Sequence, residues 1–595
     1  MTFKSVLVAN RGEIALRVMR TAKRMGLRTV AVYSDADREA PHVRAANEAI
    51  NIGRSSPRES YLNVSSVLKA PGEAVHPGYG FLSENPEFAE AVLKEGRVWI
   101  GPPAAAIRAM GDKANAKALA AKAGVPVLPT YDKHPEFPLM IKALAGGGGR
   151  GIRIVFSQNE FPDALKTAQS EAQHSFGDSR VLLEKALLSP RHVEIQIFAD
   201  SHGNCIHLGE RDCSVQRRHQ KLIEEAPSPA VNEALRAAMG AAAVAVARAA
   251  GYTGAGTVEF LLGEDGRFWF MEMNTRLQVE HPVTEALTGL DLVEWQLRIA
   301  AGEPLPAKQE EIRFSGHAIE VRLCAEDPQR DFLPQAGRLA LWQPSQAVRL
   351  EHALETGISI SPHYDSMIAK LIAHAPDRDQ ARGQLTAALD ETVALGLPTN
   401  KAFLAAILRD KNFSSGKVST DFLAENEIPV DRPASSDYDL AATLLAGDFG
   451  EWTGWSNNPT HSSRACFDGQ MVALSAANRN RQARKQLRHV IEGDTVHFAR
   501  GGASFSLRNT LYDPPVPKGA GSGGGRLLAP MNGRVVAVHA KVGEQIEAGR
   551  PLVILEAMKM EHGLSLNFSS RIKSVHVAMG AQVAPGHLLI EVEPA

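Results

Sequence analysis

The sequence predicts a large α/β protein that ends in a small all-β domain. Three observations lead to this prediction. The first residues alternate apolar runs with a helical pattern, residues 514–526 are rich in glycine and proline, and the residues that follow contain one unit copied twice. At 595 residues the chain is long enough for several domains, each with its own core.

The opening of the chain predicts a mainly parallel sheet with helices on its faces. Val6 to Ala9 and Thr29 to Tyr33 are short apolar runs that indicate strands, and residues 13–25 between them place apolar side chains at helical spacing. Strand, helix and strand in this order are typical of a parallel sheet. The turn at residues 10–13 lacks the GxGxxG pattern, so dinucleotide binding is not predicted.

Composition excludes several classes of partner. Lys and Arg number 65 against 67 Asp and Glu, so neither a nucleic acid nor a strongly charged surface is an expected partner. Apolar runs stay shorter than a membrane span, which predicts no membrane partner. An immediate strand leaves no room for a signal or transit peptide. Because the four cysteines show no disulfide-rich spacing, we expect a reducing cytoplasm.

A nucleotide site is predicted around residues 139–151. An apolar strand, residues 139–142, ends in Lys142, and a glycine-rich run follows at residues 146–151. Closely spaced glycines let backbone N–H groups converge on phosphate oxygens. A run of four glycines by itself is more often a flexible loop, and the lysine on the strand favours the phosphate site. The spacing does not match GxxxxGK[ST], so the site is not a P-loop.

Two carboxylates lie within apolar strands, where an unpaired charge is costly. They are Glu259 in residues 256–260 and Glu272 in residues 268–274. Together with Asn274 they are hard oxygen ligands, which suit Mg²⁺ bridging the phosphates of ATP. The alternative for either glutamate is a plain ion pair with a buried arginine.

Polar side chains alternate from Glu272 to Glu280. On an extended segment, Glu272, Asn274, Arg276, Gln278 and Glu280 would point to one face. The flanking apolar residues favour a buried site over a strand that faces solvent. We therefore predict an extended polar stripe that can hold an anion, with Arg276 and Lys221 as its cations.

The C-terminal residues contain a duplication. The segment from Gly533 to Leu552 recurs from Ser570 to Leu589 at a constant offset of 37 positions. Such self-similarity predicts two equivalent strand units folded against each other. Lys559 lies between Met558 and Met560 at the joint, where a hairpin turn would expose it. A lone exposed lysine is usually only a solvated charge, and the duplication around it favours a function.

This region resembles the biotinyl domain of biotin-dependent carboxylases, a flattened all-β barrel related to lipoyl domains. The string Ala557-Met558-Lys559-Met560 matches the signature whose lysine becomes biotinylated. The lysine of lipoyl domains usually follows Asp and precedes Ala, so methionine on both sides favours biotin. The resemblance implies covalent biotin on Lys559, attached by a biotin protein ligase, as a swinging arm for activated CO2.

Residues 1–423 resemble the biotin carboxylases of the ATP-grasp class. Long strings carry this resemblance, among them residues 76–85, 210–214, 216–221 and 272–282. It implies an ATP-dependent ligase that uses Mg²⁺ or Mn²⁺ and activates bicarbonate through carboxyphosphate in order to carboxylate biotin.

The same resemblance implies roles for individual residues. Nucleotide contacts are implied for Lys113, Lys142, Gly147, Gly148, Gly149, Glu184, Lys185, Leu187, His192, Gln216 and His219. Metal ligands are implied at Glu259, Glu272 and Asn274. The implied catalytic set is Glu280 as the base, Arg276, Lys221, Gln278 and the Val279 backbone around bicarbonate, and Arg322 at the ureido oxygen of biotin.

Six segments are expected along the chain. They are a biotin carboxylase N-terminal domain (1–112), an ATP-grasp domain (113–328), a biotin carboxylase C-terminal domain (329–430), a β-rich domain (437–513), a flexible linker (514–526) and a biotinyl carrier domain (527–595). The β-rich domain loosely resembles the subunit-contact region of acyl-CoA carboxylase α subunits, especially those of the methylcrotonyl and geranyl type. No stretch is left for a carboxyltransferase, so we expect a separate β subunit and a hetero-oligomer.

Several alternatives stay open at this point. Acetyl- or propionyl-CoA competes with methylcrotonyl- or geranyl-CoA as the acyl substrate. A chain with a degenerate ATP site would be a carrier or scaffold only. The segments 62–75 and 124–138, which are shorter than usual, favour that alternative, and intact Lys113, Glu280 and Arg322 oppose it. A third alternative is another ATP-grasp ligase, against which the biotinyl domain argues.

Overall fold

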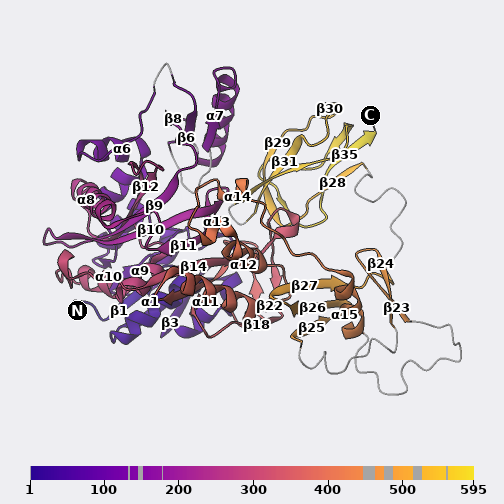
Figure 1. Cartoon of the computed structure of the whole chain (residues 1–595), viewed down its shortest axis with the longest axis horizontal. Coiled ribbons are helices and arrows are strands. Elements are labelled where there is room, and N and C mark those ends of the chain that lie inside the picture. Colours follow the sequence, from indigo (N-terminus) through magenta and orange to yellow (C-terminus); the bar gives the residue numbers. More distant parts are fainter. Residues whose placement is uncertain are drawn as a thin grey trace.

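The computed structural model of the chain describes residues 2–131, 135–144, 152–176, 178–445, 463–474, 487–513, 525–557 and 560–594. It is a mixed α/β protein with the predicted parallel sheet at its N-terminus and a separate β domain at its C-terminus (Figure 1). Among the described residues, none of the helices is both long and apolar enough to cross a membrane.

The N-terminal sheet forms as the apolar pattern predicts. Strand β1 (Ser5–Val8), helix α1 (Gly12–Arg24) and strand β2 (Arg28–Ser34) follow each other. The sheet has the order β3-β2-β1-β4-β5, and its pairs are parallel. Its other members are β3 (Glu48–Gly53), β4 (Ala74–His76) and β5 (Val98–Trp99), flanked by α2 (Pro41–Ala45), α3 (Val64–Leu68), α4 (Pro86–Lys94) and α5 (Ala104–Gly111).

One antiparallel sheet of eight strands forms the centre of the molecule. Its order is β13-β12-β9-β10-β11-β14-β21-β19. The strands are β9 (Arg191–Ala199), β10 (Cys205–Arg217), β11 (Gln220–Ala226), β12 (Gly254–Leu262), β13 (Phe268–Asn274), β14 (His317–Cys324), β19 (Arg349–His352) and β21 (Met367–Ala375). The helices around it are α8 (Glu233–Ala249), α9 (His281–Thr288), α10 (Leu292–Ala300), α11 (Arg378–Glu391), α12 (Lys401–Arg409), α13 (Lys411–Ser414) and α14 (Phe422–Glu425).

A small subdomain projects from this sheet, at the top of Figure 1. It contains a three-stranded sheet of β7 (Ile152–Val155), β6 (Leu139–Ala143) and β8 (Val181–Lys185), with α7 (Phe161–Phe176) against it. Helix α6 (Lys113–Lys122) precedes it. The strand expected at residues 139–142 is confirmed. Gly147, Gly148 and Gly149 lie outside the described residues.

The region after the carboxylase part begins with a helix that the sequence reasoning did not predict. This helix, α15 (Ser435–Leu445), packs on the short strands that were expected. They are β23 (Ser463–Phe467), β24 (Gln470–Leu474), β25 (His489–Glu492), β26 (Thr495–Arg500) and β27 (Ala503–Arg508). Lys401 joins this region to the carboxylase part, because its buried Nζ donates to the carbonyls of Leu389 at 3.0 Å and of Gly502.

The C-terminal domain confirms the duplication. Its two four-stranded sheets have the orders β28-β35-β33-β30 and β32-β31-β29-β34, so each sheet takes strands from both copies. Three strands of the first copy, β29 (Gly533–Val538), β30 (Gln545–Ile546) and β31 (Pro551–Ala557), recur 37 positions later as β33 (Ser570–Val575), β34 (Gln582–Val583) and β35 (Leu588–Pro594). The remaining strands are β28 (Arg526–Leu528) and β32 (Met560–Ser565).

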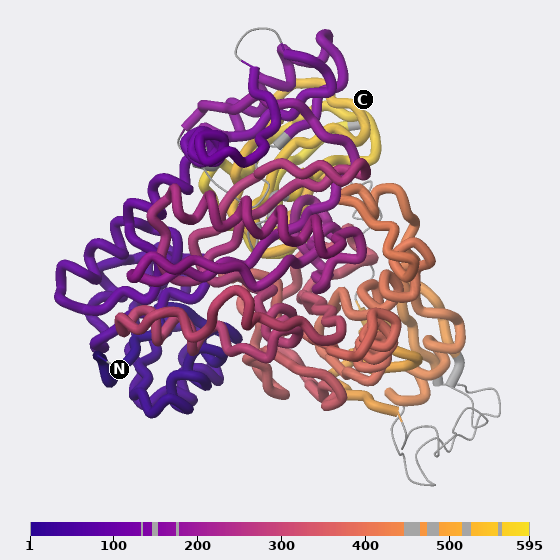
Figure 2. Tube along the Cα trace, turned by 60° about the vertical axis from the view of Figure 1, so that its left-hand side comes forward, coloured from indigo at the N-terminus to yellow at the C-terminus, as the bar shows by residue number. Residues whose placement is uncertain are grey.

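The C-terminal domain lies beside the carboxylase part rather than beyond it. In Figure 2 its trace, in yellow, runs next to the projecting subdomain. Leu333, from the carboxylase part, packs against the apolar core that Leu552, Leu555 and Ile590 help to form. Lys559, between β31 and β32, lies outside the described residues.

Candidate active site

A single large cleft of about 2520 Å³ collects the predicted site residues. Its walls come from the N-terminal sheet, the central sheet, the projecting subdomain and the C-terminal domain. All the predicted site residues that the structure describes line it: Lys113, Lys142, Glu184, Lys185, Leu187, His192, Gln216, His219, Lys221, Glu259, Glu272, Asn274, Arg276, Gln278, Val279, Glu280 and Arg322. The individual roles of these residues remain predictions.

One end of the cleft carries three lysines around one carboxylate. Glu184 on β8 contacts Lys142 on β6 and accepts a hydrogen bond from Lys117 on α6 at 2.7 Å. Burial raises the pKa of Glu184, but Lys142 and Lys117 outweigh burial and lower it. Partial burial lowers the pKa of Lys113, whose Nζ lies 3.4 Å from the Ala143 carbonyl. More positive than negative charge lies here, as phosphate oxygens require.

The predicted metal ligands lie on two neighbouring strands. Glu259 on β12 is directly opposite Glu272 on β13, and Asn274 donates to Glu259 at 2.7 Å. Burial and the neighbouring Glu259 raise the pKa of Glu272. Two facing carboxylates of which one resists ionisation are stabilised by a cation between them, so these oxygen donors fit Mg²⁺.

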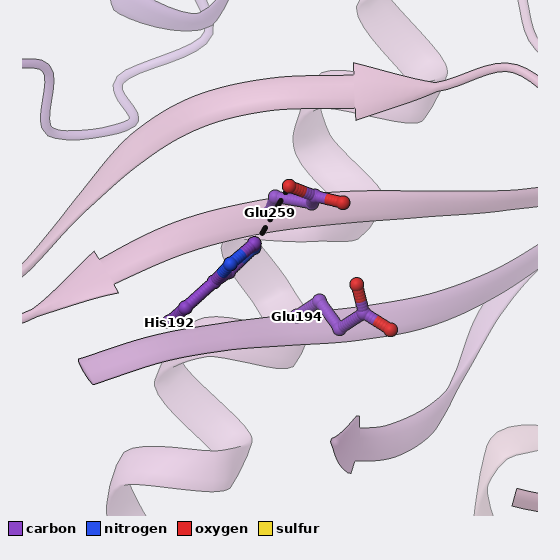
Figure 3. A group of neighbouring side chains, drawn as sticks. All are labelled: His192, Glu194 and Glu259. Carbon is purple, nitrogen blue, oxygen red and sulfur yellow. Dashed lines mark hydrogen bonds and ion pairs between the residues drawn. The ribbon is translucent and has the colours of Figure 1, made fainter. Parts of the chain in front are cut away.

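A second cluster of potential ligands is already neutralised by the protein. Figure 3 shows His192 and Glu194 on β9 facing Glu259, with ligand atoms within 4.8 Å of one another. His192 Nε2 lies 2.8 Å from Glu259. Glu194, however, accepts from Arg211 at 2.5 Å and from Lys221 at 2.6 Å. Because these two cations balance Glu194, the cluster reads as a support for Lys221 rather than as another metal site.

Lys221 is the centre of the site. Its Nζ donates to Glu194 at 2.6 Å, to Glu259 at 3.0 Å and to Glu280 at 2.7 Å. Burial lowers the pKa of Lys221, but the surrounding anionic groups outweigh burial and hold it well above its usual value. The ammonium is therefore charged and fixed in place between the metal ligands and the predicted base.

Glu280 lies between two cations. Lys221 contacts one of its oxygens, and Arg322 on β14 donates to the other at 3.0 Å. Burial raises the pKa of Glu280, but Lys221, Arg322 and Arg211 outweigh burial and lower it below its usual range. The carboxylate is thus ionised and can accept a proton, and both cations beside it can hold an anionic substrate.

The extended stripe predicted from Glu272 to Glu280 is wrong beyond Asn274. Strand β13 ends at Asn274, and residues 275–280 form a loop before α9 begins at His281. The backbone leaves the sheet because the Thr275 N–H donates to the Glu84 carboxylate at 3.0 Å. The predicted side chains nevertheless converge.

Contacts within the loop explain that convergence. Gln278 donates to Glu259 at 2.9 Å. Arg276 donates to Asn274 at 3.1 Å and to Glu84 at 3.0 Å. The loop therefore delivers the side chains to the site that a strand was expected to deliver.

Several residues of the site were missed by the sequence reasoning. Lys370 on β21 is fully buried; its Nζ donates to the Val279 carbonyl at 2.7 Å and pairs with Glu13 at 3.2 Å. It therefore fixes the backbone next to Glu280. A lone lysine inside the apolar strand 367–375 was an available signal, because such a charge is rarely buried without a partner.

Four family models match the chain and together cover most of it. Residues 2–107 match the biotin carboxylase N-terminal domain, and residues 108–308 match the ATP binding domain of the carbamoyl-phosphate synthase L chain. Residues 320–425 match the biotin carboxylase C-terminal domain, and residues 526–592 match the domain of biotin-requiring enzymes.

Curated relatives match over nearly the whole length. The mitochondrial methylcrotonoyl-CoA carboxylase subunit alpha of Dictyostelium discoideum is 42% identical, over 96% of this chain and 93% of that protein. That of Rattus norvegicus is also 42% identical, over 99% and 93%. The propionyl-CoA carboxylase alpha chain of Ruegeria pomeroyi is 40% identical, over 99% and 100%.

Solved structures match the carboxylase part. The biotin carboxylase domain of the Hydrogenobacter thermophilus 2-oxoglutarate carboxylase, in complex with MgADP, ADP and bicarbonate, is 46% identical with a TM-score of 0.69. The match covers 71% of this chain and 98% of that one. The biotin carboxylase of Campylobacter jejuni, in complex with β-γ-ATP, is 43% identical with the same TM-score, over 71% and 99%.

Fold and site thus define an ATP-grasp biotin carboxylase with its carrier domain on the same chain. More particularly, the chain belongs to the family of biotin carboxylase α subunits of acyl-CoA carboxylases. The predicted ligase class, and ATP, Mg²⁺, biotin and bicarbonate as its cofactors and substrate, are confirmed by these matches.

Proposed function

We propose that Glu280 is the base and Lys221 and Arg322 are the anion-binding cations of bicarbonate-dependent carboxylation of biotin on Lys559. The contact of Glu280 with both cations carries this proposal. A carboxylate held between two fixed positive charges can take a proton from an anion that those charges also bind.

Each proposed role follows from a contact in the cleft. Lys142 and Lys113 hold the ATP phosphates, and Mg²⁺ held by Glu259 and Glu272 would neutralise their charge. Glu280 removes the proton of bicarbonate, whose oxygen then attacks the γ-phosphorus while the bond to ADP breaks. The product, carboxyphosphate, separates into CO2 and phosphate.

The second half of the reaction depends on Arg322. Phosphate takes the N1 proton of biotin, and the guanidinium of Arg322 stabilises the negative charge on the ureido oxygen as N1 forms its bond to CO2. Arg322 is preorganised for this, because Glu224 accepts from its Nε at 2.6 Å. A fixed donor at a developing oxyanion is worth about 3 kcal/mol.

We further propose that the chain works with a separate carboxyltransferase β subunit. Methylcrotonoyl-CoA carboxylase α subunits are 42% identical to it, which favours a 3-methylcrotonyl- or geranyl-type acyl-CoA. A propionyl-CoA carboxylase α chain at 40% identity supports the alternative substrate. A biotin protein ligase as a partner and the domain boundaries given above remain part of the proposal.

The cytoplasm is the proposed compartment. Cys205, Cys213, Cys324 and Cys466 are free thiols, which a reducing compartment preserves. The names of several relatives include the word mitochondrial, so expression of the tagged chain and its fractionation test this part.

ADP release tests the catalytic part of the proposal. We expect the purified chain with MgATP to release ADP only when bicarbonate is present, and faster when free biotin is added. Glu280→Gln should abolish the bicarbonate-dependent part, whereas Leu93→Ser, an exposed position on α4, should leave it unchanged. Bicarbonate-independent ADP release, or full activity of Glu280→Gln, contradicts the proposed roles.

A further inference from the structure

Two tight turns of the carboxylase part form a small surface against the C-terminal domain. We call it the docking platform: Arg217 and Arg218, at the turn between β10 and β11, and the segment Asp331 to Leu333. Arg218 donates to Asp331 at 2.7 Å, and the Arg217 guanidinium lies 4.2 Å from the centroid of the Phe332 ring. These contacts join the two turns into one surface.

The backbone of the platform is held in an unusual conformation. Arg218, His219, Asp331 and Phe332 all have positive φ, at 49°, 63°, 52° and 57°. Left-handed backbone costs about 1–3 kcal/mol at a residue other than glycine and persists where the surroundings impose it, often at functional sites. Both turns of the platform thus carry strain.

The carrier domain meets the platform through one apolar and one polar contact. Leu333 packs against the apolar core of the carrier domain. His562 on β32, three positions after Lys559, is 5% exposed and lies among Arg217, Arg218 and Asp331. The side of the carrier next to the biotinylated residue is therefore the side that touches the carboxylase part.

Both polar partners at this contact have unused hydrogen-bonding capacity. Among the described residues, His562 Nε2 has no hydrogen-bond partner, and neither do Nε and Nη1 of the buried Arg217. A neutral imidazole nitrogen accepts a hydrogen bond and a guanidinium donates one. Burial and the two arginines lower the pKa of His562 to about 4, so it is a neutral acceptor at neutral pH.

The platform is continuous with the nucleotide site. Gln216 and His219, both expected to contact the nucleotide, flank Arg217 and Arg218 on the same turn. The cleft that holds them is also lined by Arg534 and other residues of the carrier domain. A change at either site therefore moves through one turn of four residues.

We propose that the docking platform seats the carrier domain of the same chain for carboxylation, and that the turn at residues 216–219 couples this docking to nucleotide binding. The proposal rests on the proposed function, because it names where the arm of Lys559 is presented to Glu280 and Arg322. The occupant is the carrier domain of the same chain, since Leu333 and His562 already lie against each other's domains.

The contact is suited to release as well as to docking. The Arg218–Asp331 pair is largely exposed, and such pairs contribute about 0–1 kcal/mol. A tethered domain needs little affinity, because a short linker gives an effective concentration of the order of mM. The carrier can therefore leave for a carboxyltransferase after each turnover.

Labelling of the carrier tests the docking. The biotinylated full-length chain is mixed with MgATP and ¹⁴C-bicarbonate, and the initial rate of label transfer to the protein is measured beside ADP release driven by free biotin. Leu333→Ser and His562→Lys should each slow protein labelling about tenfold, the usual effect of losing one anchoring contact of ~1.4 kcal/mol. Free biotin needs no docking, so its turnover should not change.

The controls separate this proposal from the proposed function. Leu93→Ser removes an exposed leucine far along the chain and should alter neither rate. Unchanged protein labelling in both platform variants overturns the docking site. Loss of free-biotin turnover in the unaltered chain instead contradicts the proposed function. Biotin content, measured by mass spectrometry, shows that His562→Lys is still loaded.

A mixing experiment tests docking within one chain. Chains with Lys559→Arg lack the arm, and chains with Glu280→Gln lack the base. Label should appear on the mixture at least tenfold more slowly than on the unaltered chain. Labelling at the unaltered rate overturns docking within the chain in favour of docking between chains.

Hydrogen exchange tests the coupling. Amides of residues 560–565 should exchange at a different rate when MgADP is bound, and Leu333→Ser should remove that difference. Equal exchange with and without MgADP overturns the coupling.

Discussion

Glu320 is a carboxylate whose removal should stabilise the protein. It lies on β14 with no exposure to solvent, and both of its oxygens lack a hydrogen-bond partner among the described residues. Its neighbour directly across the strands is Glu224. Burial raises the pKa of Glu320 well above its usual value, and Glu224 adds to the effect that Lys370 opposes. At neutral pH the protein must either bury this charge or bind a proton to remove it.

Replacement by methionine removes the cost without leaving a cavity. Methionine is apolar and of similar size, so Glu320→Met should raise the free energy of unfolding by about 1–3 kcal/mol, the cost of an unsatisfied buried polar group. A carboxyl with a raised folded-state pKa loses stability as pH rises above its unfolded value of about 4.3. The gain should therefore be larger at pH 8 than at pH 5.

Glu224→Met is the matched control. Glu224 also has no exposure to solvent, but it accepts from Arg322 at 2.6 Å, so its removal leaves that guanidinium with only part of its anionic support. We expect a loss of about 3 kcal/mol and slower carboxylation of free biotin. Thermal unfolding midpoints at pH 5 and pH 8 measure both variants. Destabilisation by Glu320→Met at pH 8, or a gain that does not change with pH, refutes the reasoning.

Three further predictions concern the site and the carrier. Lys370→Met should release the Val279 carbonyl and lower the rate of bicarbonate-dependent ADP release about 100-fold, a loss of ~2.7 kcal/mol, with nucleotide affinity unchanged; equal loss of both contradicts a role in positioning. Glu272→Gln should raise the Mg²⁺ concentration needed for half-maximal ADP release about tenfold, because one of two facing carboxylates is lost; an unchanged Mg²⁺ titration argues against Glu272 as a ligand. Protein labelling should fall about tenfold between pH 7.5 and pH 5.5 relative to turnover of free biotin, because the pKa of His562 is about 4 when docked and about 6.5 when free, and charging it costs docking ~1.4 kcal/mol; a profile identical to that of His562→Asn rules this out.

Local patterns account for the parts of the fold that the sequence predicted. The β1–α1–β2 unit follows from apolar spacing within about thirty residues, and the carrier domain follows from the repeat at 37 positions. Helix α15 was missed because residues 435–445 carry little amphipathic signal and the runs noticed further on were those of strands.

The site shows where such reasoning ends. Cleft residues in quoted motifs were found, but the Arg211–Glu194 pair depends on the register between β9 and β10, which no local pattern reveals. Lys370 reaches Val279 across 91 positions of sequence. The polar alternation from Glu272 to Glu280 indicated the right side chains and the wrong backbone, because a loop turned by Glu84 satisfies the same convergence.

The attachment of Lys401 to Gly502 has a consequence for the travel of biotin. It fastens the β26–β27 hairpin to the carboxylase part, and the described chain stops eleven positions later, at Asp513. The tether to the carrier therefore starts from a fixed point, and the residues 514–524 can span no more than about 40 Å. The places that the carrier can visit thus fill a sphere with a fixed centre, and any carboxyltransferase that receives CO2 must bring its acyl-CoA inside it.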